Sequence, residues 1–341
     1  MFEQYILFLM KGLTIAFLFV GVLAFFGMII ARIKEQSSSH TEGAISVSNV
    51  TDEYDEIRDL LEEETLNSSD LKSLKRERKK EEKLKRKQSS DNDSEKRVFV
   101  VNFVGDTEAS EVHHMREVIT AIVMTAKSQD EVVITLESNG GYVHSYGYAA
   151  AQIQRITDKG IPCTICVDTV AASGGYLMAC VADKIVAAPF AIVGSIGVIA
   201  ELPNFNRFLK KYDIDYEQHT AGKYKSTLSM FAENTDEGRS KFKEELAQTH
   251  VLFKDFLKEN RQNVNVENIA TGEYWHARQA LSLGLIDTIS TSDDYLLNFW
   301  KKGHSIYKVS YSEKKTFLDK LSEKFAEASR KLVASVMKSI K

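Results

Sequence analysis

Asp168-Thr-Val-Ala-Ala-Ser-Gly-Gly-Tyr176 is the stretch on which the interpretation of this sequence depends. It follows an apolar run, Ile161 to Val167, that is typical of a buried strand, and it leads into a helical pattern. Ser173 therefore stands at a strand-to-helix turn, where unpaired backbone N–H groups and the helix dipole favour negative charge. A lone Ser-Gly-Gly is more often a helix cap or a turn than a catalytic site, so Ser173 needs partners.

Two other segments could supply those partners. The apolar run Val132 to Leu136 ends in Glu137-Ser-Asn-Gly-Gly141, a second strand followed by a Gly-Gly turn. Backbone N–H groups of that turn could form half of an oxyanion hole beside the serine. Downstream, Thr220-Ala-Gly-Lys-Tyr-Lys225 follows the strand-like residues 214–219 and contains two lysines. By itself this third segment is equally typical of a solvated basic loop.

Together the three segments resemble the S49 peptidase family, the signal peptide peptidase A group of the Clp protease/crotonase superfamily. The resemblance covers residues 98–310 and an N-terminal segment that would be a membrane anchor. It implies that Ser173 is a nucleophile and that Lys225, the last residue of a Gly-x-Tyr-Lys motif, is its base. Such Ser–Lys pairs are a variant of the serine-protease triad. The resemblance implies no metal and no cofactor.

The same resemblance assigns the oxyanion donors to glycines. Gly174 follows the nucleophile, and Gly140 and Gly141 lie in the loop where the family has Ser-Pro-Gly-Gly. This chain has Asn139 in place of the family's proline, which removes a rigid residue from the loop but keeps its N–H donors.

Strand and helix patterns alternate from Val98 onwards. The predicted elements are strands over 98–104, 132–136 and 161–167 and helices over 111–127, 146–157 and from about 173. Repeated units of this length imply parallel pairing, with functional loops at the carboxyl ends of the strands. The sequence therefore predicts an α/β fold with a mostly parallel sheet, and the resemblance narrows this to the spiral Clp protease/crotonase-like fold.

Composition and charge restrict the class of protein. The 341 residues are 43% hydrophobic and 27% charged, which is typical of a globular chain, and the net charge of −4 argues against nucleic acid as a partner. Cys163 and Cys166 lie within one strand pattern and should point to opposite faces, so buried free thiols are expected. The eight histidines show no spacing typical of a metal site.

Outside the catalytic region the chain divides into three further segments. Residues 12–31 are uncharged and long enough to cross a bilayer, which predicts an uncleaved anchor within residues 1–34. Residues 35–97 are rich in charge and predict a linker, with contact to anionic lipid headgroups as the alternative. Residues 311–341 predict an amphipathic helix that packs on its own domain or a neighbouring subunit, or lies on the membrane. The broken apolar region 185–200 predicts two buried strands instead of a second membrane crossing.

Together with the predicted anchor, the resemblance implies a membrane-anchored serine endopeptidase that cleaves peptides or unfolded protein segments at the bacterial inner membrane. A homo-oligomer is expected because relatives build rings that share sites between neighbours. Arg32 and Lys34 favour a cytoplasmic catalytic domain, whereas the resemblance favours the periplasmic side, which we adopt as the expectation.

Three alternatives remain open at this point. A non-hydrolytic membrane scaffold and an acyl-CoA enzyme of the crotonase type share the fold, but neither needs both Ser173 and Lys225. A Ser-His-Asp triad could instead use His276 and Asp287.

Overall fold

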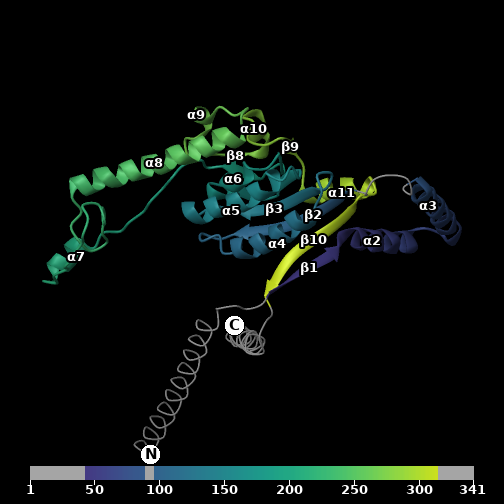
Figure 1. The fold of residues 1–341 in the computed structure, drawn as a ribbon, viewed down its shortest axis with the longest axis horizontal. Coiled ribbons are helices and arrows are strands. Elements are labelled where there is room, and N and C mark those ends of the chain that lie inside the picture. Colours follow the sequence, from purple (N-terminus) through teal and green to yellow (C-terminus); the bar gives the residue numbers. More distant parts are fainter. Residues whose placement is uncertain (1–42, 89–95, 314–341) are drawn as a thin grey trace, which may run out of the picture. The chain divides into compact units, whose positions relative to one another are not determined.

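The computed structural model describes residues 43–88 and 96–313, and residues 45–311 of these form one compact unit (Figure 1). The described strands are β1 (Gly43–Asn49), β2 (Arg97–Gly105), β3 (Glu131–Ser138), β4 (Cys163–Val167), β5 (Val170–Ala172), β6 (Lys184–Ala187), β7 (Ile192–Gly194), β8 (Tyr274–His276), β9 (Thr288–Ile289) and β10 (Ser305–Glu313). The described helices are α2 (Val50–Thr65), α3 (Ser68–Gln88), α4 (Val112–Thr125), α5 (Val143–Thr157), α6 (Gly174–Ala179), α7 (Asn206–Lys211), α8 (Asp236–Asn260), α9 (Val266–Ile269), α10 (Ala277–Ser282) and α11 (Ser292–Lys301).

The strands form one mostly parallel sheet, so the predicted α/β class is confirmed. Its order is β1-β10-β2-β3-β4-β6-β9, with β5 pairing to β3 and β7, and β8 joining β7 antiparallel. The helical connections α4 and α5 follow β2 and β3, as the alternation predicts. The last residue of β3, Ser138, pairs with Ala171 of β5. This register brings the Gly-Gly loop after β3 beside Ser173, because both lie at the carboxyl ends of neighbouring strands.

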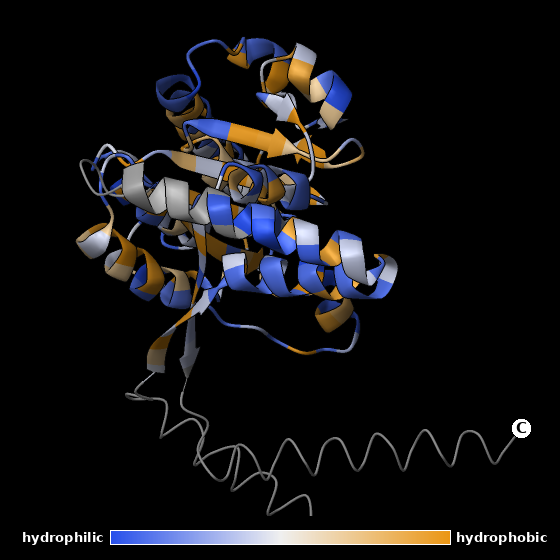
Figure 2. Ribbon diagram, turned by 90° about the vertical axis from the view of Figure 1, so that its right-hand side faces the viewer, coloured by the Kyte–Doolittle hydropathy of each residue, from blue (hydrophilic) through white to orange (hydrophobic). Residues whose placement is uncertain are grey.

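Apolar side chains fill both faces of the sheet, which explains the near-continuous hydrophobic runs of its central strands. Phe99, Val101 and Cys163 belong to the cluster beneath the long helices, whereas Val100 and Cys166 belong to a separate, smaller cluster. The two cysteines therefore point to opposite faces, and all three cysteines are buried and free, as predicted. Figure 2 shows hydrophobic colouring along strands and hydrophilic colouring over much of the helices that face the viewer.

The N-terminal part of the described chain differs from the expected linker. Residues 43–65 form edge strand β1 and helix α2, and Val50 at the start of α2 is buried in the smaller core cluster. The Thr51 hydroxyl accepts the N–H of Ile306 at 2.8 Å, and the Trp300 indole donates to Asp55 at 3.1 Å. The charged residues of α2 had suggested a solvated segment, but a few apolar and aromatic contacts on one face are enough to dock the helix.

Residues between β7 and α8 form an arm that carries α7 at its end, away from the sheet (Figure 1). The strand-like segment 214–219 is not a strand here: its residues are exposed, and no described strand pairs with them. The arm leads into α8, whose N-cap Thr235 accepts the N–H of Gly238. Only the second half of α8 is buried, through Phe253 and Leu257.

Two predicted segments lie outside the described residues. These are the anchor at 12–31 and most of the amphipathic helix at 311–341, although 311–313 are the end of β10 instead of helix. Among residues 43–88 and 96–313, the structure contains no helix that is both apolar and long enough to span a bilayer.

Candidate active site

Ser173 occupies the junction between β5 and α6 with a strained backbone. Its φ of 52° and ψ of −118° lie outside the regions that a residue with a side chain normally adopts. Its N–H donates to the Gly194 carbonyl at 2.8 Å and its carbonyl accepts the N–H of Leu177, so the backbone is held on both sides. The side chain makes no capping bond to α6. Strain of this kind, held by surrounding hydrogen bonds, is typical of a functional site.

The loop after β3 touches Ser173 so closely that only glycine fits. A methyl group at Gly140 would lie 2.7 Å from the Ser173 Cβ and 2.6 Å from the Gly174 nitrogen, and the residue also has a φ of +87°. A methyl group at Gly141 would overlap the Thr107 carbonyl. The Gly-Gly sequence is therefore needed for this close approach of backbones.

The backbone N–H groups of the three glycines differ in their availability. The Gly140 N–H donates to the Ser138 hydroxyl at 3.0 Å. Within the described chain, no hydrogen bond uses the N–H groups of Gly141 and Gly174. Gly141 and Gly174 are therefore available as oxyanion donors, whereas Gly140 holds the loop in position.

An apolar cavity of about 160 Å³ opens beside Ser173. Gly141, Gly147 and Gly174 form part of its wall, and the second half of α8 covers it with Leu252, Phe253 and Phe256. Val143, Leu177 and Val198 add further apolar surface. A cavity of this size and lining suits an apolar side chain of a bound peptide. The contribution of α8 could not be predicted from sequence, because its apolar residues are equally typical of ordinary packing.

Lys225 lies on the arm, and no described contact joins it to Ser173. Its side chain is exposed. The neighbouring Lys223 forms an ion pair with Glu237 at 2.8 Å, which fixes the lysine loop to the first turn of α8. Glu237 and Phe253 are 16 residues apart (253 − 237), or about 24 Å along a helix. The lysine loop and the cavity beside Ser173 are therefore at different ends of α8.

The histidine alternative is not assembled. Asp287 accepts hydrogen bonds from the Arg261 guanidinium at 2.9 and 3.0 Å and from the Ile185 N–H at 2.7 Å. His276 has a ring nitrogen 3.1 Å from the Phe190 carbonyl oxygen. Asp287 and His276 therefore each bond to other groups. No described hydrogen bond joins this aspartate to this histidine, as a Ser-His-Asp triad requires.

The cysteines do not compete with Ser173 as nucleophiles. Burial raises the pKa of the Cys166 and Cys180 thiols to about 12, and it raises the pKa of Cys163 still further. A thiol attacks as its thiolate, so these residues stay unreactive near neutral pH.

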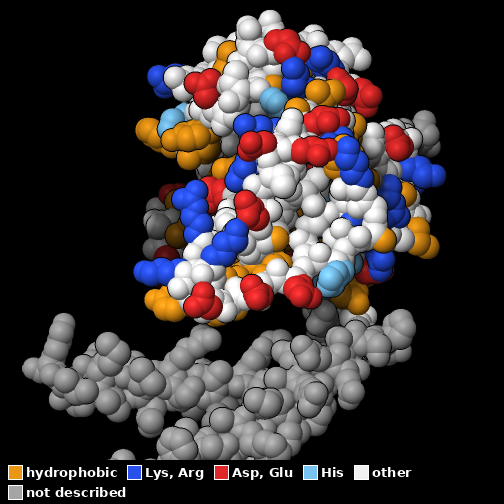
Figure 3. Space-filling view, turned by 90° about the vertical axis from the view of Figure 1, so that its left-hand side faces the viewer, with side chains coloured by type: hydrophobic (Ala, Val, Ile, Leu, Met, Phe, Trp, Pro, Cys, Tyr) orange, Lys and Arg blue, Asp and Glu red, His pale blue; other side chains and the backbone are white. Residues whose placement is uncertain are grey.

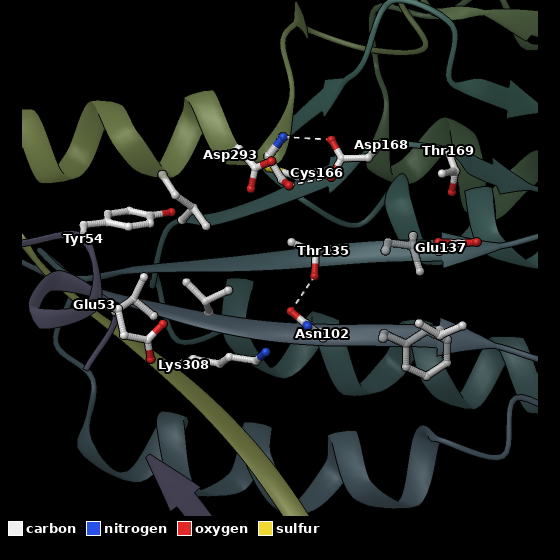
Figure 4. A pocket seen from close by; sticks show the side chains of 17 residues that line it. Glu53, Tyr54, Asn102, Thr135, Glu137, Cys166, Asp168, Thr169, Asp293 and Lys308 are labelled. Atoms are coloured by element: carbon white, nitrogen blue, oxygen red, sulfur yellow. Dashed lines mark hydrogen bonds between the residues drawn. The ribbon is translucent and has the colours of Figure 1, made fainter. Parts of the chain in front are cut away.

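A larger cavity, of about 420 Å³, is bordered by α2, α11 and the carboxyl halves of β2, β3 and β4 (Figure 4). On its sheet wall the Thr135 hydroxyl donates to the side-chain oxygen of its strand neighbour Asn102 at 2.6 Å, and Asp168 accepts both the N–H and the hydroxyl of Ser292. Ser292, a serine that lines this larger cavity, is thus hydrogen-bonded to the Asp168 carboxylate. Ser173 does not line this cavity. Ser173 and the free N–H groups of Gly141 and Gly174 line the smaller, apolar cavity instead.

Comparisons with known proteins bear on the family of the chain. The sequence matches Peptidase family S49 over residues 155–303 and Peptidase family S49 N-terminal over residues 1–153. It is 42% identical over 338 residues to "Probable protease SohB" of Haemophilus influenzae, covering 96% of this chain and 94% of that protein. It is 49% identical over 229 residues to "Probable protease SohB" of Buchnera aphidicola from Acyrthosiphon pisum, covering 67% of this chain and 68% of the relative.

A solved structure of a mutant of the "1510-N membrane-bound stomatin-specific protease", in complex with a substrate peptide, aligns with a TM-score of 0.41 and 16% identity. The alignment covers 69% of this chain and 99% of that one. Because the Haemophilus relative aligns over nearly the whole sequence, the chain belongs to peptidase family S49, a family of proteases.

Proposed function

We propose that this protease is a serine endopeptidase in which Ser173 attacks the peptide carbonyl. The observation that carries the proposal is the meeting of three features at one place: the strained φ of 52° at Ser173, the unused N–H groups of Gly141 and Gly174, and the apolar cavity beside them. Donors in such positions stabilise the oxyanion of the tetrahedral intermediate, and the loss of one donor typically lowers the rate by about 10²–10³.

The chemistry follows from this arrangement. The Ser173 Oγ forms a bond to the carbonyl carbon while its proton passes to a base, and that proton then moves to the leaving amine as the C–N bond breaks. Water then adds to the resulting ester and gives a proton to the same base. That proton returns to the Ser173 Oγ as the ester C–O bond breaks and the acyl half leaves as a carboxylic acid. The Gly141 and Gly174 N–H groups hold the negative oxygen in both halves of the reaction.

Lys225 of a neighbouring copy is the base in this proposal. Within one chain the lysine loop and the Ser173 cavity lie at different ends of α8, which supports a second subunit as the source of the lysine. The arm that carries Lys225 exposes a group of apolar and aromatic side chains suited to contact with another subunit: Phe205, Phe208, Tyr212, Ile214, Tyr216 and Phe231. Figure 3, which faces this end of the molecule, shows hydrophobic side chains at the surface among charged ones. Burial in such a contact would favour the uncharged lysine that a base requires.

Anchorage to the bacterial inner membrane through residues 12–31 completes the proposal, with the catalytic domain on the periplasmic side and peptides or unfolded protein segments as substrates. Orientation is tested with alkaline phosphatase fused after residue 95. An active phosphatase supports the periplasmic side, and an inactive phosphatase together with a fluorescent cytoplasmic reporter would reverse it.

The nucleophile is tested by covalent labelling of the purified protein with a fluorescent fluorophosphonate. Labelling is expected in the wild type and absent in Ser173→Ala. Ser195→Ala is the matched control, because Ser195 follows β7 closely and shares a φ of 52°. Labelling that survives in Ser173→Ala would contradict the assignment of the nucleophile.

A further inference from the structure

Tyr146 lies between the two glycine segments that supply the free N–H groups. It is fully buried in the first half of α5, and its ring lies against Gly174. Burial raises the pKa of the Tyr146 hydroxyl, so the group keeps its proton at neutral pH. The Tyr146 hydroxyl makes hydrogen bonds on one side, and the Tyr146 ring packs against the Gly174 backbone on the other.

On the hydroxyl side, Tyr146 ends a directed series of hydrogen bonds. The Gly140 N–H donates to the Ser138 hydroxyl. The Ser138 hydroxyl is the donor in its bond to the Tyr146 oxygen, because the single hydroxyl proton of Tyr146 goes to the Asp106 carbonyl. The Tyr146 O–H then donates to the Asp106 carbonyl at 2.7 Å. Bonds that run in one direction polarise and strengthen one another in a buried setting. The tyrosine hydroxyl therefore ties the Gly140–Gly141 loop to the end of β2.

On the ring side, Tyr146 packs against the second donor. A methyl group at Gly174 would overlap the Cγ of the Tyr146 ring, so the ring lies in contact with the glycine backbone. This contact sets how far the start of α6 can approach α5. One side chain thus touches Gly174 directly and holds Gly141 through its neighbour Gly140.

We infer that Tyr146 is a positioning residue that sets the spacing between the Gly141 and Gly174 oxyanion donors. This inference rests on the proposed function of Ser173 and extends it to a residue that lies outside the lining of the cavity. The role requires both parts of the tyrosine: the ring fixes one donor and the hydroxyl fixes the other.

Tyr146→Phe tests the hydroxyl part in the full-length protein, because the ring remains. We expect kcat on a peptide substrate to fall by about tenfold to a hundredfold, since the Gly141 N–H is no longer held in place. KM should stay within about twofold, because the apolar cavity that binds the side chain is unchanged. The rate of fluorophosphonate labelling should fall in parallel with kcat, since phosphonylation develops the same negative oxygen.

Tyr176→Phe is the matched control. Tyr176 is equally buried, and its hydroxyl donates to the Leu285 carbonyl at 2.8 Å, a single acceptor that lies outside the oxyanion loops. This variant loses a buried hydroxyl of the same kind and should keep a near-normal kcat. An equal fall of kcat in Tyr146→Phe and Tyr176→Phe would show a general structural effect and overturn the inference.

Ser138→Ala tests the same hydrogen-bond series without altering the tyrosine, and it serves if Tyr146→Phe folds poorly. It should lower kcat by a similar factor, and the double variant should lose little more than either single one, because both changes break one series. If the wild type is labelled and active but Tyr146→Phe or Ser138→Ala leaves kcat unchanged, the inference about Tyr146 is overturned and the proposed function stands. A wild type that resists labelling would overturn the proposed function, and the inference with it.

Discussion

At the scale of single residues, the site is built from positions where space excludes any side chain. Gly140 combines a φ of +87° with contact to Ser173, and Gly141 lies against the Thr107 carbonyl. These glycines allow the loop after β3 to bring its N–H groups to the serine. Ser173 itself accepts an unfavourable backbone conformation at the same place, which the hydrogen bond to Gly194 maintains.

Substitution of the proposed dyad should abolish peptidase activity without loss of the fold. Ser173→Ala removes the nucleophile, and Lys225→Arg keeps a positive charge that cannot be lost, so neither variant can complete acyl transfer. Peptide hydrolysis and circular dichroism are measured together on purified protein. Turnover near the wild-type rate in folded Lys225→Arg would exclude this lysine as the base.

Gly147 should determine which side chains the cavity accepts. It lines the cavity on α5, and a Cβ built there meets no atom within 4 Å. Gly147→Leu is therefore expected to fill the cavity. It should lower kcat/KM by at least about tenfold for peptides with a Leu or Phe at the cleavage position, whereas kcat/KM for peptides with Ala at that position should stay the same. The measurement is a comparison of peptides that differ only at that position. Ala151→Leu, one turn further along α5 and exposed, is the control, and an equal change of preference there would exclude this role for Gly147.

At the scale of elements, the sequence predicted the strands and helices whose residues repeat with a clear period. Strand β3 and helix α4 follow the expected ranges 132–136 and 111–127 closely, because buried strands read as continuous apolar runs and α4 has buried apolar residues at a helical period. The predictions from sequence were wrong where contacts between distant segments determine the structure. Helix α2 is highly charged yet docks through Val50, and residues 214–219 have strand-like residues but no described strand beside them.

The site divides in the same way. Local motifs pointed to Ser173 and its glycines as candidates, and the structure brings these residues together, because each motif is needed for a local backbone shape. Tyr146 and Phe253 could not be found in this way, since their roles depend on contacts between segments that are distant in the sequence. A buried tyrosine at the start of a helix has no distinctive pattern of its own, and α8 reaches the Ser173 cavity only after the chain has folded.

The docking of α2 leads to a prediction about stability. Val50 is buried against the sheet, whereas Val47 in β1 is exposed. Val50→Ala should lower the free energy of unfolding by about 1.5 kcal/mol, because it removes two buried methyl groups. Val47→Ala should change the free energy of unfolding little. Urea unfolding of both variants measures the difference. Equal stability of the two variants would mean that residues 43–65 act as a linker, as their composition first suggested.

At the scale of the whole molecule, the described residues of one chain keep the proposed nucleophile apart from its proposed base. They place Ser173 under the second half of α8 and attach the Lys225 loop to its first turn. The arm between β7 and α8 also exposes aromatic side chains, such as Phe208 and Tyr212, that are buried by no other described segment. A ring of subunits in which each arm reaches the next cavity would account for both features.

Mixing two inactive variants tests this shared site. If Lys225 acts on the Ser173 of a neighbour, an oligomer formed from equal amounts of Ser173→Ala and Lys225→Ala chains contains some sites with both groups intact. A complete site needs the Lys225→Ala chain to supply serine and the adjacent Ser173→Ala chain to supply lysine, which random assembly allows at about a quarter of positions. Co-expressed variants should therefore regain about a quarter of wild-type peptidase activity, and separately purified ones should have none. Light scattering checks that both preparations form oligomers of the same size. Mixed oligomers without activity would place the base in the same chain as its serine, and the arm would then have to fold back onto its own cavity.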